Sequence, residues 1–194
     1  MTEYIAITDK TPLPDAQQAR AWWDDFKMLD NIREHSETVC RVALTITDWL
    51  AQAGVRLNRE AVEVGALLHD IAKTPCLGTN KLHAQEGGEI INRLGFPELA
   101  YLVANHVYLS EDHPLDETMV VNYADKRVTH NQIVDLDARF EYIAARYGLD
   151  DPARLARIQT GLKYARRAER MIFSHLAPRH SPDDIMLLEG SRDD

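Results

Sequence analysis

The sequence predicts an all-α fold, a bundle of about seven to eight helices. Apolar residues recur at helical spacing through most of the 194 residues, which is the main signal for amphipathic helices. Glycine and proline divide these stretches at positions typical of helix ends and helix starts. No set of segments alternates in the manner of strands, because AIT and TIT are too short to count.

We expect the first four helices at residues 15–29, 32–53, 58–73 and 82–94. Asp15 and Asn58 precede the first and third helices, where their side chains can accept a hydrogen bond as N-caps. A glycine follows the second and the fourth helix, where glycine commonly ends a helix. The third helix should end before Pro75, because the residue before a proline disfavours helical geometry. The Gly87-Gly88 pair inside the fourth helix is unfavourable for a helix, so it indicates close packing or a close approach of a ligand there.

We expect the last four helices at residues 97–109, 117–129, 135–147 and 152–176. Pro97 and Pro152 stand at first-turn positions, where proline is tolerated because the backbone N–H is unpaired there. Gly148 follows the penultimate helix and can end it. Asp151 can cap the long last helix.

One helical domain is expected at residues 15–176, which include the long last helix. An extended N-terminal arm, residues 1–14, precedes this domain, and a loose tail, residues 177–194, follows it. The apolar run from Ile185 to Leu188 could dock the tail onto the bundle. A chain of 194 residues suits one domain with a sizeable core.

The overall composition argues against several classes of protein. The net charge is 22 − 31 = −9, which disfavours a general nucleic-acid binder or a protein that binds anionic membranes. The two cysteines, Cys40 and Cys76, do not form a disulfide framework and favour a reduced, cytoplasmic protein. We see no signal peptide, and no apolar run approaches the roughly 20 residues of a transmembrane helix.

Titratable side chains fall on or beside the apolar faces of five of these helices. They are four histidines and two aspartates: His35, His69, Asp70, His83, His106 and Asp125. A lone buried histidine usually has its own partner, but six such groups in one small core would need many partners. A shared divalent-cation site satisfies them all, because imidazole and carboxylate are preferred metal ligands. The remaining histidines lack this placement and are expected to be structural: His113, His130, His175 and His180.

The order of these residues resembles the HD superfamily of metal-dependent phosphohydrolases, whose pattern is H…HD…D. His35 supplies the first histidine, His69-Asp70 the doublet and Asp125 the last aspartate. LLHDIAK is similar to the HDIG signature LLHDIGK, with alanine in place of glycine. REHS lies upstream of the doublet, and HAQEGGEII, VANHV and NYADKRV lie downstream of it in the family order. The resemblance covers roughly residues 31–147.

The additional histidines His83 and His106 are similar to those of family members that bind two metals. The resemblance implies a first metal on His35, His69 and Asp125. It implies a second metal on His83 and His106. The implied ions are Mn or Fe, with Zn, Ni, Co or Mg as alternatives. Such members include hydrolases of diadenosine tetraphosphate and cyclic-dinucleotide phosphodiesterases, although this chain lacks the GYP motif of the latter.

The implied activity is hydrolysis of a phosphoester or phosphoanhydride bond in a small phosphorylated metabolite or nucleotide. A metal lowers the pKa of bound water toward about 7, and a pair of metals also stabilises phosphoryl oxygens. Asp70 is the expected bridge and a catalytic residue, because a carboxylate can bind two ions whereas an imidazole cannot. Lys73, one turn later, is placed to contact a phosphate oxygen, or is a solvated charge that complements the helix dipole. Weaker candidates for phosphate binding are Lys126, Arg127 and Arg139.

Two other functions remain open from the sequence. Some HD proteins are diiron oxygenases, and the same ligands can serve iron and dioxygen. A non-catalytic metal-binding sensor or interaction module is the third hypothesis, although the intact ligand set argues against it. The sequence contains no motif that reads a nucleobase, so it does not identify the substrate.

Overall fold

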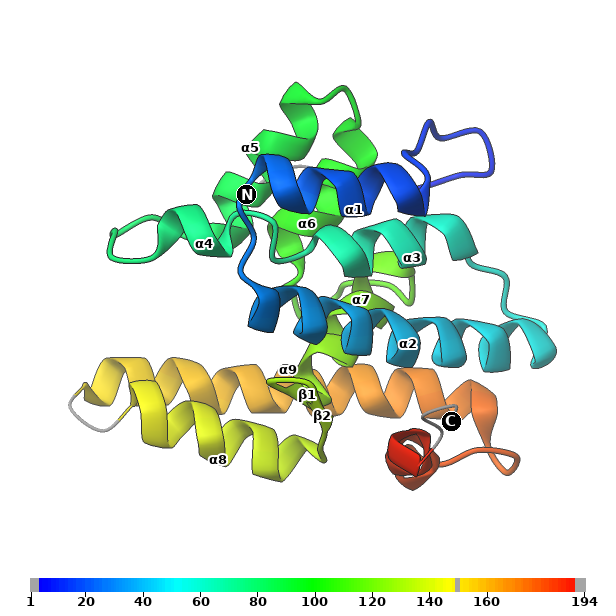
Figure 1. Cartoon of the computed structure of the whole chain (residues 1–194). Coiled ribbons are helices and arrows are strands. Elements are labelled where there is room, and N and C mark those ends of the chain that lie inside the picture. The colour runs from blue at the N-terminus through cyan, green and yellow to red at the C-terminus, as the bar shows by residue number, and fades with distance from the viewer. Residues whose placement is uncertain (1–3, 149–150, 191–194) are drawn as a thin grey trace.

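The structure, a computed structural model, describes residues 4–148 and 151–190 of the chain. Within these ranges the molecule is a bundle of helices with one short antiparallel hairpin (Figure 1). The all-α fold predicted from the sequence is confirmed. No helix in the described part of the chain is long and apolar enough to cross a membrane.

Apart from the short helix at Lys73–Cys76, which the sequence did not predict, the helices lie close to the expected positions. In chain order they are α1 (Ala16–Asp25), α2 (Asp30–Gln52), α3 (Arg59–Leu68), α4 (Lys73–Cys76), α5 (His83–Arg93), α6 (Pro97–Asn105), α7 (Glu117–Lys126), α8 (Leu136–Tyr147) and α9 (Pro152–Leu176). The other elements are the paired strands β1 (Val128–Thr129) and β2 (Gln132–Ile133) and a 3-10 helix, η1 (Pro182–Gly190). The expected N-caps Asp15, Asn58 and Asp151 each accept a hydrogen bond from the backbone of their helix.

Four helices end at least three residues earlier than the sequence predicted. The first of them, α1, ends at Asp25 rather than at residue 29. α3 ends at Leu68 rather than Lys73, and α6 ends at Asn105 rather than near residue 109. Each is followed by a histidine whose ring donates a hydrogen bond to a carbonyl of the last helical turn. Such a bond satisfies a carbonyl left free at the helix end. The same hydrogen bond therefore ends the helix and orients the histidine ring. α7 ends at Lys126, because the tight β1–β2 hairpin follows at once.

The bundle is organised around α2, which packs against α3 and α7 (Figure 1). Its inward face carries Val39, Val42 and Ile46, all fully buried. α8 and α9 lie side by side along one side of the bundle, and α9 also contacts α7. Leu13 of the arm packs against the core, and Ile185 of η1 is fully buried. The described part of the expected loose tail is therefore docked on the bundle.

At Gly87 and Gly88, α5 and α6 approach each other so closely that an added side chain would not fit. A Cβ atom added at Gly88 would lie 2.7 Å from the Cβ of Ala104, and Gly87 is similarly restricted. Such a distance is far inside ordinary packing contact, so this approach requires glycine. The glycine pair therefore reflects close helix packing. It brings the His83 and His106 rings together, with 5.3 Å between their centroids.

Candidate metal centre

Two histidines are oriented by the helix ends that they follow. His69 comes directly after α3, and His106 comes directly after α6. Their Nδ1 atoms lie 2.7 Å from the carbonyl oxygens of Ala66 and Val103, respectively. A carbonyl only accepts hydrogen bonds, so each Nδ1 is the donor. In the neutral imidazole, Nε2 therefore carries the lone pair that a metal needs.

His35 is oriented in the same way by the β1–β2 hairpin. Its Nδ1 donates to the carbonyl oxygen of His130 at 2.7 Å, and its Nε2 lies 3.1 Å from Asp125 Oδ1. His130 occupies the hairpin turn with a φ of 57°, a left-handed conformation that is uncommon for residues other than glycine. The sequence predicted a structural role for His130, and its main chain also fixes the direction of a candidate ligand.

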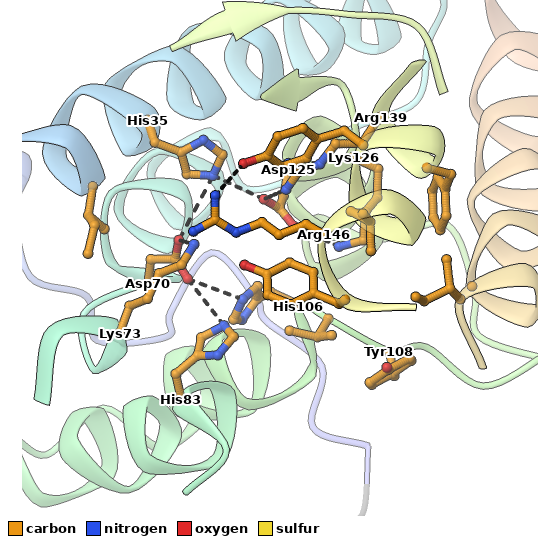
Figure 2. Close-up of a pocket in the computed structure, with 18 of the residues that line it drawn as sticks. His35, Asp70, Lys73, His83, His106, Tyr108, Asp125, Lys126, Arg139 and Arg146 are labelled. Atoms are coloured by element: carbon orange, nitrogen blue, oxygen red, sulfur yellow. Dashed lines mark hydrogen bonds and ion pairs between the residues drawn. The ribbon is translucent and has the colours of Figure 1, made fainter. Parts of the chain in front are cut away.

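The carboxylate of Asp70 lies among the histidines (Figure 2). Its Oδ1 is 3.2 Å from His83 Nε2 and 3.8 Å from His106 Nε2. Its Oδ2 is 3.4 Å from His69 Nε2 and 3.9 Å from His35 Nε2. The two oxygens therefore face different pairs of imidazoles, which is the arrangement that a bridge between two ions requires.

Asp125, in the last turn of α7, completes the side of the centre that contains His35 and His69. Its Oδ1 lies 3.8 Å from His69 Nε2. Ligand atoms that share one ion, each about 2.0–2.2 Å from it, lie about 3 to 4 Å apart. The buried Nε2 of His69 has no hydrogen-bond partner among the described residues, as expected of a ligand atom. The donor set thus fits a divalent metal.

The structure brings all six candidate ligands together. Two sets of three ligand atoms lie within 4.8 Å of one another: His35 with His69 and Asp125, and His69 with Asp70 and His106. His69 belongs to both sets, whereas the sequence resemblance assigned it to one metal. Five of the six residues are buried. The side chain of His83 is 32% exposed and lines the adjoining cavity.

Burial and neighbouring charges shift the pKa values of Asp70 and His69 in the directions that favour an ionised carboxylate beside a positive charge. Burial raises the pKa of Asp70, but its interactions with His69 and Lys73 outweigh burial and hold that pKa well below its usual range. Burial lowers the pKa of His69, yet the carboxylates of Asp70 and Asp125 reverse this effect and raise the pKa. A proton or a metal ion at His69 Nε2 is therefore stabilised by two ionised carboxylates.

Three of the four candidate phosphate-binding residues lie beside these carboxylates. Lys73 Nζ is 2.6 Å from Asp70 Oδ2, and Lys126 Nζ is 2.6 Å from Asp125 Oδ2. Arg139 Nη2, on α8, is 3.8 Å from Asp125 Oδ1. All three residues line the same cavity as the candidate ligands His35, Asp70, His83, His106 and Asp125 (Figure 2).

Arg127 is placed differently from the sequence expectation. Its buried side chain donates to the carbonyl oxygens of Val134 and Pro182 and to the hydroxyl of Tyr123. It is not among the described residues that line the cavity, because it ties α7 to the segments after β2 and at the start of η1. We therefore exclude Arg127 from the candidate phosphate contacts.

The cavity has a volume of about 530 Å³. One wall carries five of the six candidate metal ligands, all except the fully buried His69, and another is formed by α8 and α9. This α8–α9 wall consists of Arg139, Phe140, Tyr142, Ile143, Arg146, Tyr147, Arg157, Ile158 and Gly161. Sequence reasoning singled out only Arg139 among them. The spacing of Arg139, Tyr142 and Arg146 is helical, and this signal could have indicated that they share one face.

The fold and the ligand set define a helical protein with a histidine–aspartate centre suited to divalent metals. A family model described as HD domain matches residues 32–129. The chain therefore belongs to the HD domain family, which indicates the superfamily of metal-dependent hydrolases. An uncharacterised protein of Methanocaldococcus jannaschii is 25% identical over 140 residues, which cover 64% of this chain and 82% of that protein. No solved structure matches the chain.

Proposed function

We propose that this protein is a metal-dependent phosphohydrolase that cleaves a phosphoester or phosphoanhydride bond in a small phosphorylated metabolite or nucleotide. Membership of the HD family supports the class of hydrolase. The charge of the cavity supports a phosphorylated substrate. The two free cysteines support a reducing, cytoplasmic location, which is part of the same proposal.

The observation that carries this proposal is the excess of positive charge in the cavity of an acidic protein. Two aspartates line the cavity together with six lysines and arginines: Lys73, Lys81, Lys126, Arg139, Arg146 and Arg157. The chain as a whole has a net charge of −9. Metal ions would add to the local excess, so a substrate with several negative charges is favoured. Phosphate esters carry such charge at neutral pH.

Two divalent ions are proposed at the centre, with Asp70 as the bridge. The other ligands divide as the family pattern implies: His35, His69 and Asp125 on one side, His83 and His106 on the other. The opposite directions of the two Asp70 oxygens support this division. Mn or Fe is favoured, with Zn, Ni, Co or Mg as alternatives, because nitrogen and oxygen donors suit these ions. Bound ions would supply an activated water and positive charge for the phosphoryl oxygens.

Lys73 is proposed to bind a phosphoryl oxygen of the substrate beside Asp70. Its ammonium lies 2.6 Å from Asp70 Oδ2, and the residue lines the cavity. Burial lowers the pKa of Lys73, but Asp70 and Asp125 reverse this effect and raise the pKa, so the side chain is charged at neutral pH. A flexible ammonium can exchange a carboxylate oxygen for a phosphate oxygen as substrate enters.

Anaerobic purification with metal analysis, followed by a screen of phosphorylated metabolites and nucleotides, tests this function. We expect hydrolysis that depends on a divalent metal and consumes no dioxygen. Dioxygen consumption by an iron-loaded protein would instead support the HD-type diiron oxygenase. Bound metal without turnover of any compound would support the non-catalytic sensor or interaction module.

A further inference from the structure

Arg146 is held at the cavity by two tyrosines of its own helix. Its Nη1 donates a hydrogen bond of 2.9 Å to the hydroxyl of Tyr142, one helical turn earlier. Its guanidinium carbon lies 6.0 Å from the ring centroid of Tyr142 and 5.5 Å from that of Tyr147. All three residues line the cavity, and Figure 2 shows Arg146 extending toward the side of Asp70 and Lys73. These contacts orient the guanidinium without neutralising its charge.

Most of the hydrogen-bonding capacity of Arg146 is not taken up by the described residues. A guanidinium has several N–H donors, and Tyr142 engages one of its nitrogens. The neighbours that raise the pKa of Arg146 are Tyr142 and Tyr147, and no described carboxylate forms an ion pair with it. By contrast, Lys73 and Arg139 each face a carboxylate of the metal centre. Arg146 is therefore oriented, charged and available to an anion from solution.

Positive charge in the cavity is thus divided into two groups. Lys73, Lys126 and Arg139 lie beside the metal ligands. Arg146 and Arg157 lie on the α8–α9 wall, without such a contact to the centre. A single phosphoryl group bound at the metals would engage the first group. The second group remains for another anionic part of the same molecule.

We propose that Arg146 binds a second phosphoryl group of the substrate, distinct from the phosphoryl group that is hydrolysed. This inference rests on the proposed phosphohydrolase function, and it names Arg146 as a residue that determines specificity for diphosphates or bisphosphates. A guanidinium suits this role, because its planar fork donates to two phosphate oxygens at once. α8 begins at Leu136, so Arg146 lies outside the family match at residues 32–129.

Calorimetry with the metal-loaded protein, at a buffered and saturating concentration of free Mn²⁺, tests the proposal. The first probe is inorganic phosphate. The second is methylenediphosphonate, in which two phosphoryl groups are joined through a carbon that resists hydrolysis. The third is fructose 1,6-bisphosphate, in which a sugar separates them. We expect at least one two-phosphate probe to bind about tenfold or more tightly than inorganic phosphate, and the better probe distinguishes a diphosphate from a bisphosphate substrate.

Arg146→Ala should remove this advantage and leave the affinity for inorganic phosphate within about twofold of the wild type. Arg146→Lys should restore part of the advantage, because lysine keeps the charge but loses the planar fork. Arg93→Ala is the matched control and should change neither affinity, since Arg93 is an exposed arginine of α5 outside the cavity lining. Thermal unfolding of the Arg146 variants should match the wild type, because the residue is exposed.

An equal loss of affinity for all probes in Arg146→Ala would overturn the proposal, and so would an unchanged advantage. If the wild type binds inorganic phosphate and hydrolyses phosphate esters, but neither two-phosphate probe binds more tightly, this inference fails while the proposed function stands. If neither phosphate binding nor ester hydrolysis is detected, the proposed function fails and the inference fails with it.

Discussion

The metal centre and the α8–α9 wall face the same cavity but are built differently. In the centre, His35, His69 and His106 are buried, and main-chain carbonyls fix each ring. In the wall, Arg146 and Tyr147 are exposed, and contacts within one helix hold the arginine. A change at a buried polar group is costly to folding, whereas an exposed residue can change with little effect. We infer that the centre supplies the chemistry and the wall selects the substrate.

The largest effect is expected from breaking the centre at Asp70. Asp70→Ala removes the carboxylate that faces all four imidazoles, so hydrolysis should fall to background and metal content should drop. Assays of phosphate release and metal analysis measure both effects. Asp48→Ala removes a partly exposed aspartate paired with Arg59 and should change neither. Wild-type activity in Asp70→Ala would contradict the role given to the centre.

A smaller loss is expected at Lys73, which lies beside the centre but is not a ligand. Lys73→Ala should keep the fold and the metals and lower kcat/KM by roughly 10²–10³-fold, as for other lost charge-stabilising donors. Lys163→Ala, which removes an exposed lysine of α9, is the control and should have no effect. Full metal content with wild-type kcat/KM would refute this role and move phosphate binding to Lys126 or Arg139.

Arg127 lies outside both the metal centre and the α8–α9 wall, so its substitution should affect folding and not substrate binding. Arg127→Met removes a buried donor from the carbonyls of Val134 and Pro182, so the free energy of unfolding should fall by roughly 2–4 kcal/mol. Chemical denaturation followed by circular dichroism measures this loss. Arg166→Met, at an exposed arginine paired with Asp137, should change it little. Reduced substrate affinity at unchanged stability would return Arg127 to the phosphate-binding candidates.

The candidate ligands of the centre could be found in the sequence, whereas most of the residues of the α8–α9 wall could not. A buried polar residue interrupts an apolar stripe, so His35 is conspicuous on α2 and His106 is conspicuous at the end of α6. Arg146 and Tyr142 lie on a more exposed helix face, where polar residues are common whether or not they bind a ligand. The carbonyl of His130 that orients His35 has no signature, because a main-chain contact does not depend on residue type.

Helix starts were easier to predict than helix ends, because starts depend on local contacts and ends depend on tertiary packing. Asp15 and Asn58 cap their helices through contacts within four residues, which a sequence displays directly. The ends of α3 and α6 depend on where the rings of His69 and His106 point, and tertiary packing of the centre decides that direction. Docking of η1 likewise depends on a burial site for Ile185 that only the assembled bundle provides.

The number of metal ions that the centre binds distinguishes most directly between a dinuclear and a mononuclear centre. Equilibrium dialysis against saturating Mn²⁺ under anaerobic conditions should give about two ions per chain in the wild type, as for a pair of ions bridged by Asp70. His83→Ala and His106→Ala should each reduce this content to about one ion, since each removes a ligand of the same ion. One ion per wild-type chain at saturation, with both variants unchanged, would contradict the dinuclear centre.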